Sequence, residues 1–237
     1  MLILRSVAFN VLFYLNLLLH VLAAIPTYAL PRHAFMAMAK SWGHTSLWLL
    51  RVVAGTGVEY RGLEKIPRGA LIVAAKHQSV WETFTLLTLF DDPAYIFKRE
   101  LGWIPIFGWY AVKSRMVPVD RRARGGAVRA VEELKRGRQI LIFPEGTRTA
   151  PGAAPAYKSG VVHLYMAAGV PCLPVALNSG LYWPRRKFLR HPGTIVLEVL
   201  DPIPAGLDRE EFAARLEREI ETAQGRLEAE AAREMHA

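Results

Sequence analysis

Two residues of the kind that move protons, His77 and Glu82, stand where an apolar run gives way to a helical pattern. The run 70–75 is typical of a buried strand, and Ser79 suits the start of the helix that follows. His77 then lies in the turn and Glu82 in the first helical turn, so their side chains can meet. A carboxylate on one imidazole nitrogen leaves the other free to accept a proton. The pair therefore predicts a general base.

A structural interpretation fits the same residues. Ser79 and Glu82 have the spacing of a capping box, in which the glutamate only satisfies the backbone at the start of its own helix. A single histidine such as His77 is more often a hydrogen-bonded structural side chain than a catalyst. The pair alone leaves both interpretations open.

A second strand-to-turn transition, at 143–149, carries groups suited to an anionic ligand. Pro144 ends the apolar run, Gly146 lets the backbone approach a ligand closely, and Arg148 offers a planar fork for phosphate oxygens. An ordinary turn with a surface arginine would look the same. Ligand sites of open α/β sheets gather at the carboxyl ends of strands, which is where both turns are expected.

Short apolar runs alternate with helical patterns along the chain, which predicts an α/β domain with a mostly parallel central sheet flanked by helices. The expected strands are 58–60, 70–75, 94–97, 116–119, 139–143, 171–177 and 194–199. The expected helices are 79–90, 126–135, 160–168 and a polar amphipathic tail helix with Asp208 as its N-cap, which is solvated, packs on the domain and is assigned no chemistry. Gly102, Pro105 and Gly108 are expected to break any regular element around them.

The charge of the chain is unevenly placed. The whole sequence has a net charge of +9, and residues 201–237 hold 10 acidic and 5 basic groups, a net of −5, so residues 1–200 carry +14. A body this basic attracts nucleic acid, acidic lipid headgroups or phosphorylated substrates. No familiar nucleic-acid-binding motif is present, so nucleic acid is not an expected partner. The single cysteine excludes an internal disulfide and fits a domain that faces the cytoplasm.

The first thirty residues predict a membrane anchor. No Lys, Arg, Asp or Glu occurs between Ser6 and Leu30, and about 20 apolar residues suffice for a helix to cross a bilayer. A cleaved signal peptide is the rival interpretation, although the run is longer than a usual signal core. After Pro26 and Pro31, residues 33–53 mix Trp, apolar and basic side chains, as at a headgroup boundary. A hairpin in one leaflet and a full span are both open.

We therefore expect membrane-anchoring helices in residues 1–57 and an α/β domain with a C-terminal amphipathic helix in residues 58–237. If the first helix crosses the bilayer, the basic residues of 32–51 outweigh Arg5 and place the domain in the cytoplasm. In a bacterium the membrane would be the inner membrane.

Together these segments resemble the glycerolipid acyltransferase family, which includes the 1-acylglycerol-3-phosphate acyltransferases. The resemblance rests on His77 to Glu82, on the run 143–148, on 98–109 as the second motif and on the proline-bearing strand 170–175 as the fourth. The N-terminal segment is similar to the paired membrane-embedded helices of bacterial members. The family usually has aspartate where this chain has Glu82, and the longer side chain keeps the charge.

The resemblance implies that His77 deprotonates a lysophospholipid hydroxyl, which attacks the thioester of acyl-CoA or acyl carrier protein, while Glu82 orients the histidine. It implies a pocket for the acceptor phosphate made of Lys98, Glu145, Gly146, Thr147 and Arg148, with the two cations on the phosphate. The expected reaction acylates the sn-2 hydroxyl of 1-acylglycerol-3-phosphate to give phosphatidic acid, with no metal or cofactor. Another acceptor, such as a lyso-ornithine lipid, and a non-catalytic lipid-binding protein are the alternatives.

Some remaining residues allow more than one role. Ser79 is expected to cap its helix rather than act as a nucleophile, because no Gly-x-Ser-x-Gly elbow surrounds it. Cys172 lies in an apolar strand and is expected in the core. The arginines Arg121, Arg122 and Arg124 could attract phosphate or form a solvated or membrane-facing basic patch. The tryptophans Trp103, Trp109 and Trp183 could line an acyl tunnel or lie at the membrane interface.

Overall fold

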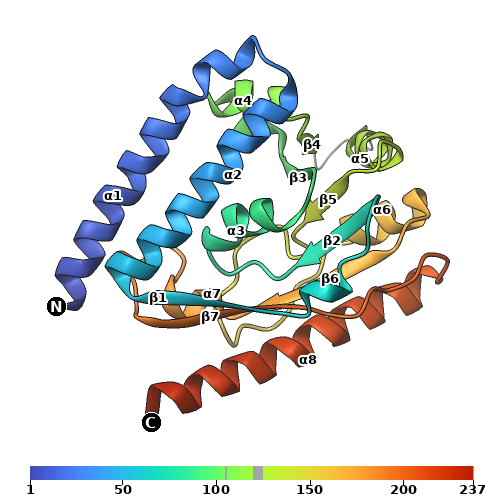
Figure 1. The fold of residues 1–237 in the computed structure, drawn as a ribbon. Coiled ribbons are helices and arrows are strands. Elements are labelled where there is room, and N and C mark those ends of the chain that lie inside the picture. Colours follow the sequence, from blue (N-terminus) through green and yellow to red (C-terminus); the bar gives the residue numbers. More distant parts are fainter. Residues whose placement is uncertain (105, 120–124, 237) are drawn as a thin grey trace.

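The computed structural model describes residues 1–104, 106–119 and 125–236. Seven strands form one sheet in the order β1-β7-β6-β2-β5-β3-β4, and every neighbouring pair is parallel except β6 and β7 (Figure 1). The prediction of an α/β domain with a mostly parallel sheet is confirmed. The strands are β1 (Thr56–Arg61), β2 (Leu71–Ala75), β3 (Pro93–Lys98), β4 (Val117–Val119), β5 (Gln139–Ile142), β6 (Cys172–Leu177) and β7 (Gly193–Val199).

Helices cover both faces of the sheet. They are α1 (Leu2–Ala23), α2 (Arg32–Leu49), α3 (Trp81–Leu89), α4 (Phe107–Lys113), α5 (Gly125–Lys135), α6 (Gly160–Ala168), α7 (Ser179–Tyr182) and α8 (Arg209–His236). One buried cluster joins the sheet to α1, α2 and α3, and another joins it to α5, α6 and α8. In β2, Leu71 and Val73 belong to the first cluster and Ile72 and Ala74 to the second, because successive side chains of a strand point to opposite faces.

The helices α1 and α2 pack against each other as a hairpin that lies beside α3 (Figure 1). Pro26 and Pro31 lie in the turn between them, as expected from the sequence. Phe13 of α1 joins Trp42 of α2 and Phe84 of α3 in one aromatic cluster. The hairpin therefore shares a core with the sheet. The division at residues 57 and 58 stays a prediction.

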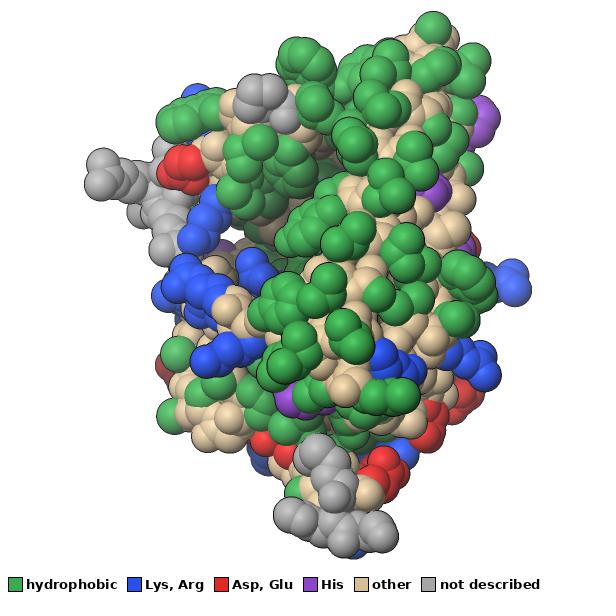
Figure 2. All heavy atoms as spheres, turned by 90° about the vertical axis from the view of Figure 1, so that its left-hand side faces the viewer, with side chains coloured by type: hydrophobic (Ala, Val, Ile, Leu, Met, Phe, Trp, Pro, Cys, Tyr) green, Lys and Arg blue, Asp and Glu red, His purple; other side chains and the backbone are tan. Residues whose placement is uncertain are grey.

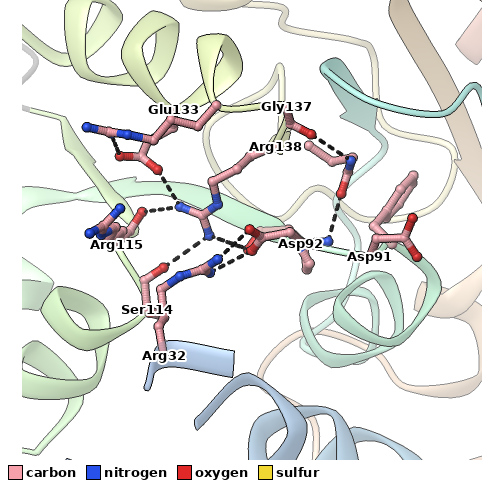
Figure 3. Close-up of polar contacts among 12 residues, drawn as sticks. Arg32, Asp91, Asp92, Ser114, Arg115, Glu133, Gly137 and Arg138 are labelled. Carbon is pink, nitrogen blue, oxygen red and sulfur yellow. Dashed lines mark hydrogen bonds and ion pairs between the residues drawn. The ribbon is translucent and has the colours of Figure 1, made fainter. Parts of the chain in front are cut away.

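Two cations of α2 bind the α/β domain. Arg32 donates to Asp92, and the buried Arg138 pairs with Asp92 at 3.2 Å and with Glu133 at 2.8 Å (Figure 3). Lys40 donates to the carbonyl oxygens at 90 and 91. Burial raises the pKa of the Asp92 carboxyl, but the bonds from the arginines outweigh burial and leave that pKa below its ordinary value. Both cations of α2 thus hold the hairpin to the domain, rather than only facing headgroups.

The segment around Gly102 and Gly108 is regular, so the expectation that these glycines break it was wrong. A short 3₁₀ helix spans Arg99–Trp103 and α4 follows it. A Cβ at Gly108 would lie 1.9 Å from the carbonyl oxygen of Gly102. These glycines therefore allow two short helices to pack closely. Pro105 lies outside the described residues.

The tail helix forms as predicted, with the Asp208 carboxylate accepting bonds from the N–H groups of Glu210 and Glu211 at 2.9 and 2.8 Å. Its apolar face packs as predicted, with Phe212 and Ile220 fully buried in the cluster that joins α8 to the sheet.

Among the described residues, one helix, α1, is long and apolar enough to span a membrane, and 17% of its most apolar window is buried. A core helix of a water-soluble domain would be mostly buried. Apolar side chains spread over the face of the molecule that carries α1 (Figure 2). The exposed apolar residues include Leu15, Leu18, Leu19 and Leu22 of α1 and Trp103, Trp109 and Val112 near α4.

Candidate active site

The structure brings His77 and Glu82 together. The strand β2 ends at Ala75, His77 lies in the turn, and Glu82 lies in the first turn of α3. The Nδ1 atom of His77 is 2.9 Å from Oε1 of Glu82, whose side chain is fully buried. Because carboxylate oxygens only accept when ionised, this bond places the ring proton on Nδ1.

Glu82 makes the contacts that both interpretations require. Its Oε1 also accepts the N–H groups of Gln78 and Ser79, each at 2.6 Å, which satisfies the backbone before the helix. Its Oε2 accepts the hydroxyl of Ser179 at 2.9 Å. The capping bonds fix the carboxylate, and the fixed carboxylate orients the ring of His77. The helix begins later than expected, with Val80 rather than Ser79 at its N-cap and no side-chain capping bond; Oγ of Ser79 accepts the N–H of Trp81 at 3.2 Å, just before the helix.

The rest of the His77 ring is held by stacking, and its second nitrogen is left without a bonding partner among the described residues. The ring stacks on Phe143, with centroids 3.9 Å apart and planes at 12°. Its Nε2 has no bonding partner among the described residues. His77 lines a large cavity, which is described below. An imidazole nitrogen placed in this way is available to take a proton from a hydroxyl bound in the cavity.

The turn after β5 is bonded directly to the turn after β2. The N–H of Thr149 donates to the carbonyl oxygen of His77 at 2.8 Å. The hydroxyl of Thr149 donates to Glu145, which is buried. Gly146 has a φ of +64°, a conformation that glycine adopts without strain. These contacts hold the loop of Arg148 in place relative to His77.

Glu145 differs from the role that the resemblance implied. Its Oε1 accepts a bond from Lys76 at 2.9 Å, and it is not among the described residues that line the cavity. Gly146, Thr147 and Arg148 do line it, as does Lys98. Glu145 therefore positions the loop rather than contacting a ligand, because its carboxylate is paired with the buried ammonium of Lys76.

The helix α8 contributes to this network, although the sequence predicted no chemistry for it. Lys76 also donates to Glu221 at 2.8 Å, and Tyr157 donates to the same carboxylate at 3.0 Å. Burial lowers the pKa of Lys76, but its bonds to Glu221 and Glu145 outweigh burial and leave the pKa raised. Further along α8, Glu228 accepts from Gln78 at 3.0 Å. Through these bonds α8 holds the turn after β2 directly and the turn after β5 through Lys76.

The cavity has a volume of about 1400 Å³. Its described lining residues are mostly apolar and come from α1, α2, α3, β3, α4 and α6, and they also include His77, Lys98 and Arg148. No Asp or Glu is among its described lining residues. A mostly apolar chamber whose lining includes cations and no described carboxylate fits an amphiphile with an anionic head.

The cysteine and one of the three tryptophans lie in the core, and the other two tryptophans are exposed. Cys172 is fully buried, as predicted, and burial raises the pKa of its thiol. Trp183 packs in the core against Phe9, 5.1 Å between ring centroids, whereas Trp103 and Trp109 are 74% and 63% exposed. Arg121, Arg122 and Arg124 lie outside the described residues.

Sequence reasoning missed two contacts of the dyad, Ser179 and Phe143. No local sequence pattern points to Ser179. Ser179 follows β6, however, and β6 is the neighbour of β2 in the sheet. Residues just after neighbouring parallel strands meet at one edge, and that rule identifies it once the strand order is known.

The site thus combines a mostly parallel α/β sheet, a histidine–carboxylate pair just after β2 and a mostly apolar cavity. The model of the family described as Acyltransferase matches residues 57–178. The chain belongs to the acyltransferase family.

Curated relatives agree with this family. The chain is 40% identical over 169 residues to a 1-acyl-sn-glycerol-3-phosphate acyltransferase of Pseudomonas aeruginosa, covering 69% of the chain and 66% of the relative. It is 30% identical over 200 residues to a lyso-ornithine lipid O-acyltransferase of the same organism, covering 76% and 77%. The matched part thus spans just under two thirds of the first relative.

A solved structure is similar over almost the whole chain. The 1-acyl-sn-glycerophosphate acyltransferase PlsC of Thermotoga maritima matches with a TM-score of 0.81 and 25% identity, covering 97% of this chain and 98% of the other. The likeness therefore includes the N-terminal hairpin as well as the sheet.

Proposed function

We propose that the protein transfers an acyl chain from a thioester, acyl-CoA or acyl carrier protein, to the sn-2 hydroxyl of 1-acylglycerol-3-phosphate, which gives phosphatidic acid. One observation carries the proposal: the free Nε2 of His77 lines the same cavity as Lys98 and Arg148. A base, two cations and an apolar chamber are what such an acceptor needs. The relatives' names favour the same acceptor.

In the proposed mechanism, Nε2 of His77 takes the proton of the acceptor hydroxyl as its oxygen bonds to the thioester carbonyl carbon. The tetrahedral intermediate then breaks its C–S bond, and the imidazolium returns the proton to the leaving thiolate. Glu82 stabilises the imidazolium through Nδ1. The products are an ester and a free thiol, the histidine is neutral again, and neither a metal nor a cofactor takes part.

The acceptor phosphate lies between Lys98 and Arg148 in this proposal. In 1-acylglycerol-3-phosphate the phosphate and the sn-2 hydroxyl are on neighbouring carbons, so the cations must be near His77. The loop of Arg148 is bonded to the backbone of His77 through Thr149. Holding two reactants in alignment in this way supplies about 7–11 kcal/mol of barrier reduction in favourable cases.

We also propose that the hairpin enters one leaflet of the membrane with the α/β domain on the cytoplasmic side. The exposed leucines of α1 and the exposed Trp103 and Trp109 support insertion. Packing of α2 on α3 supports a dip rather than a full span, because the hairpin is held along the domain. The acyl tails of both substrates would then pass from the leaflet into the cavity between hairpin and sheet.

A second acceptor is favoured by one specific observation. The relative named as a lyso-ornithine lipid O-acyltransferase is 30% identical over 200 residues. A lyso-ornithine lipid has no phosphate, so Lys98 and Arg148 would contact its carboxylate instead. The dyad mechanism is the same for either hydroxyl.

The test is an acceptor panel with the purified full chain in mixed micelles. The acceptors are 1-acylglycerol-3-phosphate, a lyso-ornithine lipid, lysophosphatidylcholine and glycerol 3-phosphate, each with acyl-CoA and with acyl carrier protein, and products are identified by mass spectrometry. The proposal expects the highest kcat/KM for 1-acylglycerol-3-phosphate. A higher kcat/KM for the lyso-ornithine lipid would establish the alternative acceptor, and no transfer to any acceptor would refute both.

A further inference from the structure

The cavity is bordered by more cations than one acceptor phosphate uses. Besides Lys98 and Arg148, the side chains of Lys158 and Arg185 line it. Acyl transfer brings two anions to one site, since the donor also carries phosphate where its pantetheine arm begins. A donor phosphate bound by this protein would lie at a distance from His77 set by that arm.

Arg185 lies in the loop that follows α7, outside the four motifs of the family. Its Nη1 donates to the carbonyl oxygen of Arg148 at 2.6 Å, which uses one of the five N–H groups of the guanidinium. Arg186 and Lys187 come next and are exposed, and they are not among the described lining residues of the cavity. Positive charge thus continues from the rim of the cavity onto the outer surface.

The loop is held from inside by another arginine. Arg190 is buried, and its guanidinium donates to the carbonyl oxygens of Lys187, Phe188 and Leu189 at 2.7, 3.1 and 2.9 Å. It also donates to Asn10 of α1 at 2.9 Å. The bonds from Arg190 fix the backbone of the loop that carries Arg185, Arg186 and Lys187. Binding an anion there would therefore cost little backbone entropy.

The backbone of Arg186 supports a role for its side chain. Its φ is +57°, in the left-handed region where glycine is unstrained and a residue with a Cβ is not. The chain keeps an arginine there in spite of the strain. Strained positions of this kind gather at ligand sites.

We propose that Arg185, Arg186 and Lys187 bind the phosphate of the acyl donor, a phosphate-bearing pantetheine thioester; this rests on the proposed function. The acceptor phosphate is next to its hydroxyl and takes the cations near His77. The donor phosphate is separated from the thioester by the whole pantetheine arm and falls at the rim, where the positive charge leaves the cavity. Coenzyme A and acyl carrier protein share this phosphate.

The experiment compares Arg185→Ala, Arg186→Gly and the matched control Arg218→Ala, an exposed arginine of α8. Arg186→Gly removes the cation and relieves the positive φ, so its melting temperature should equal or exceed that of the unaltered protein. Donors are acyl-CoA, acyl carrier protein and the phosphate-free S-acyl-N-acetylcysteamine. Coenzyme A binding is also measured by calorimetry, without turnover.

We expect the KM for acyl-CoA and acyl carrier protein to rise about five- to tenfold in both loop variants. In Arg186→Gly the acceptor KM and the kinetics of the phosphate-free donor should stay unchanged. Arg185→Ala is compared by its donor KM alone, because Arg185 also donates to the carbonyl oxygen of Arg148. A rise in the KM for acyl-CoA alone, or for acyl carrier protein alone, would show which donor binds at the loop and would support the site. Unchanged donor KM in Arg186→Gly would overturn the proposal, as would a rise in the acceptor KM alone. Loss of binding to anionic vesicles with unchanged donor KM would also overturn it, because the loop would then contact headgroups.

Failure of the proposed function gives a different result. The unaltered protein would then transfer no acyl chain from any donor, including the phosphate-free one. Binding of coenzyme A that weakens in Arg186→Gly would still support an anion site at the loop, and equal binding in both proteins would overturn it.

Discussion

The ammonium of Lys76 lies 2.9 Å from the carboxylate of Glu145 and 2.8 Å from that of Glu221. Lys76 precedes the proposed base, and Glu145 belongs to the loop of Arg148. One buried cation therefore ties both loops of the site to α8. Such a tie holds the base and the phosphate-binding arginine in one geometry.

Replacing Lys76 by Met should destabilise the protein and lower kcat together. Removing one partner leaves Glu145 buried without its counter-charge, which costs about 3–5 kcal/mol in comparable pairs. The free energy of unfolding and kcat are measured for Lys76→Met and for the double variant Lys76→Met/Glu145→Gln, which restores much of the stability. An unchanged kcat in a Lys76→Met protein of reduced stability would show that the tie does not position the site.

The same lysine sets a pH dependence. The folded-state pKa of Lys76 is raised above its ordinary value of 10.5, so its stabilising effect is fully present below that value and is lost as the pH rises through the raised pKa. The difference in melting temperature between the unaltered protein and Lys76→Met should be constant from about pH 7 to about pH 9 and shrink above about pH 10.5. A difference that shrinks between pH 7 and 9 would contradict this.

Glu82→Gln separates the charge of the dyad from its geometry. A glutamine keeps an oxygen where Gln78, Ser79 and His77 donate, and its amide can donate to Ser179. The protein should stay folded, while the imidazolium loses its stabilising charge. We expect kcat to fall about a hundredfold or more. If Glu82 only caps its helix, kcat will be unchanged.

The fold was largely predictable because its signals are local. The buried run of β2 and the N-cap at Asp208 follow from composition and spacing alone. The meeting of His77 and Glu82 also follows from local chain direction. What failed depends on tertiary packing: Glu221 reaches Lys76 from 145 positions away, and Gly108 lies in a helix that packs so closely on the carbonyl oxygen of Gly102 that a Cβ there would clash.

Arg148→Ala should raise the KM for 1-acylglycerol-3-phosphate about tenfold or more, because a hydrogen bond to a charged group contributes about 1.5–3 kcal/mol. The KM for a phosphate-free donor should not change. The matched control is Arg129→Ala, an exposed arginine of α5. A change confined to the donor KM would show that Arg148 does not hold the acceptor phosphate.

Membrane binding should depend on the exposed face of α1. Leu15 and Leu19 are 47% and 56% exposed, and burying one leucine in lipid contributes about 1.5–3 kcal/mol. The double variant Leu15→Asp/Leu19→Asp should lose at least about tenfold in vesicle partitioning by co-sedimentation. Activity on short-chain micellar substrates should persist. Leu63→Asp, an exposed leucine of the α/β domain, is the control, and equal partitioning of all three proteins would rule out insertion through α1.

The central claim is that the free nitrogen of His77 removes the proton of the acceptor hydroxyl. Single-turnover transfer from acyl-CoA to 1-acylglycerol-3-phosphate is measured for His77→Ala with both substrates saturating, alongside its melting temperature and its affinity for the acceptor. The account predicts a rate about 10²–10⁴ times slower with folding and binding unchanged. A rate equal to that of the unaltered protein would contradict it.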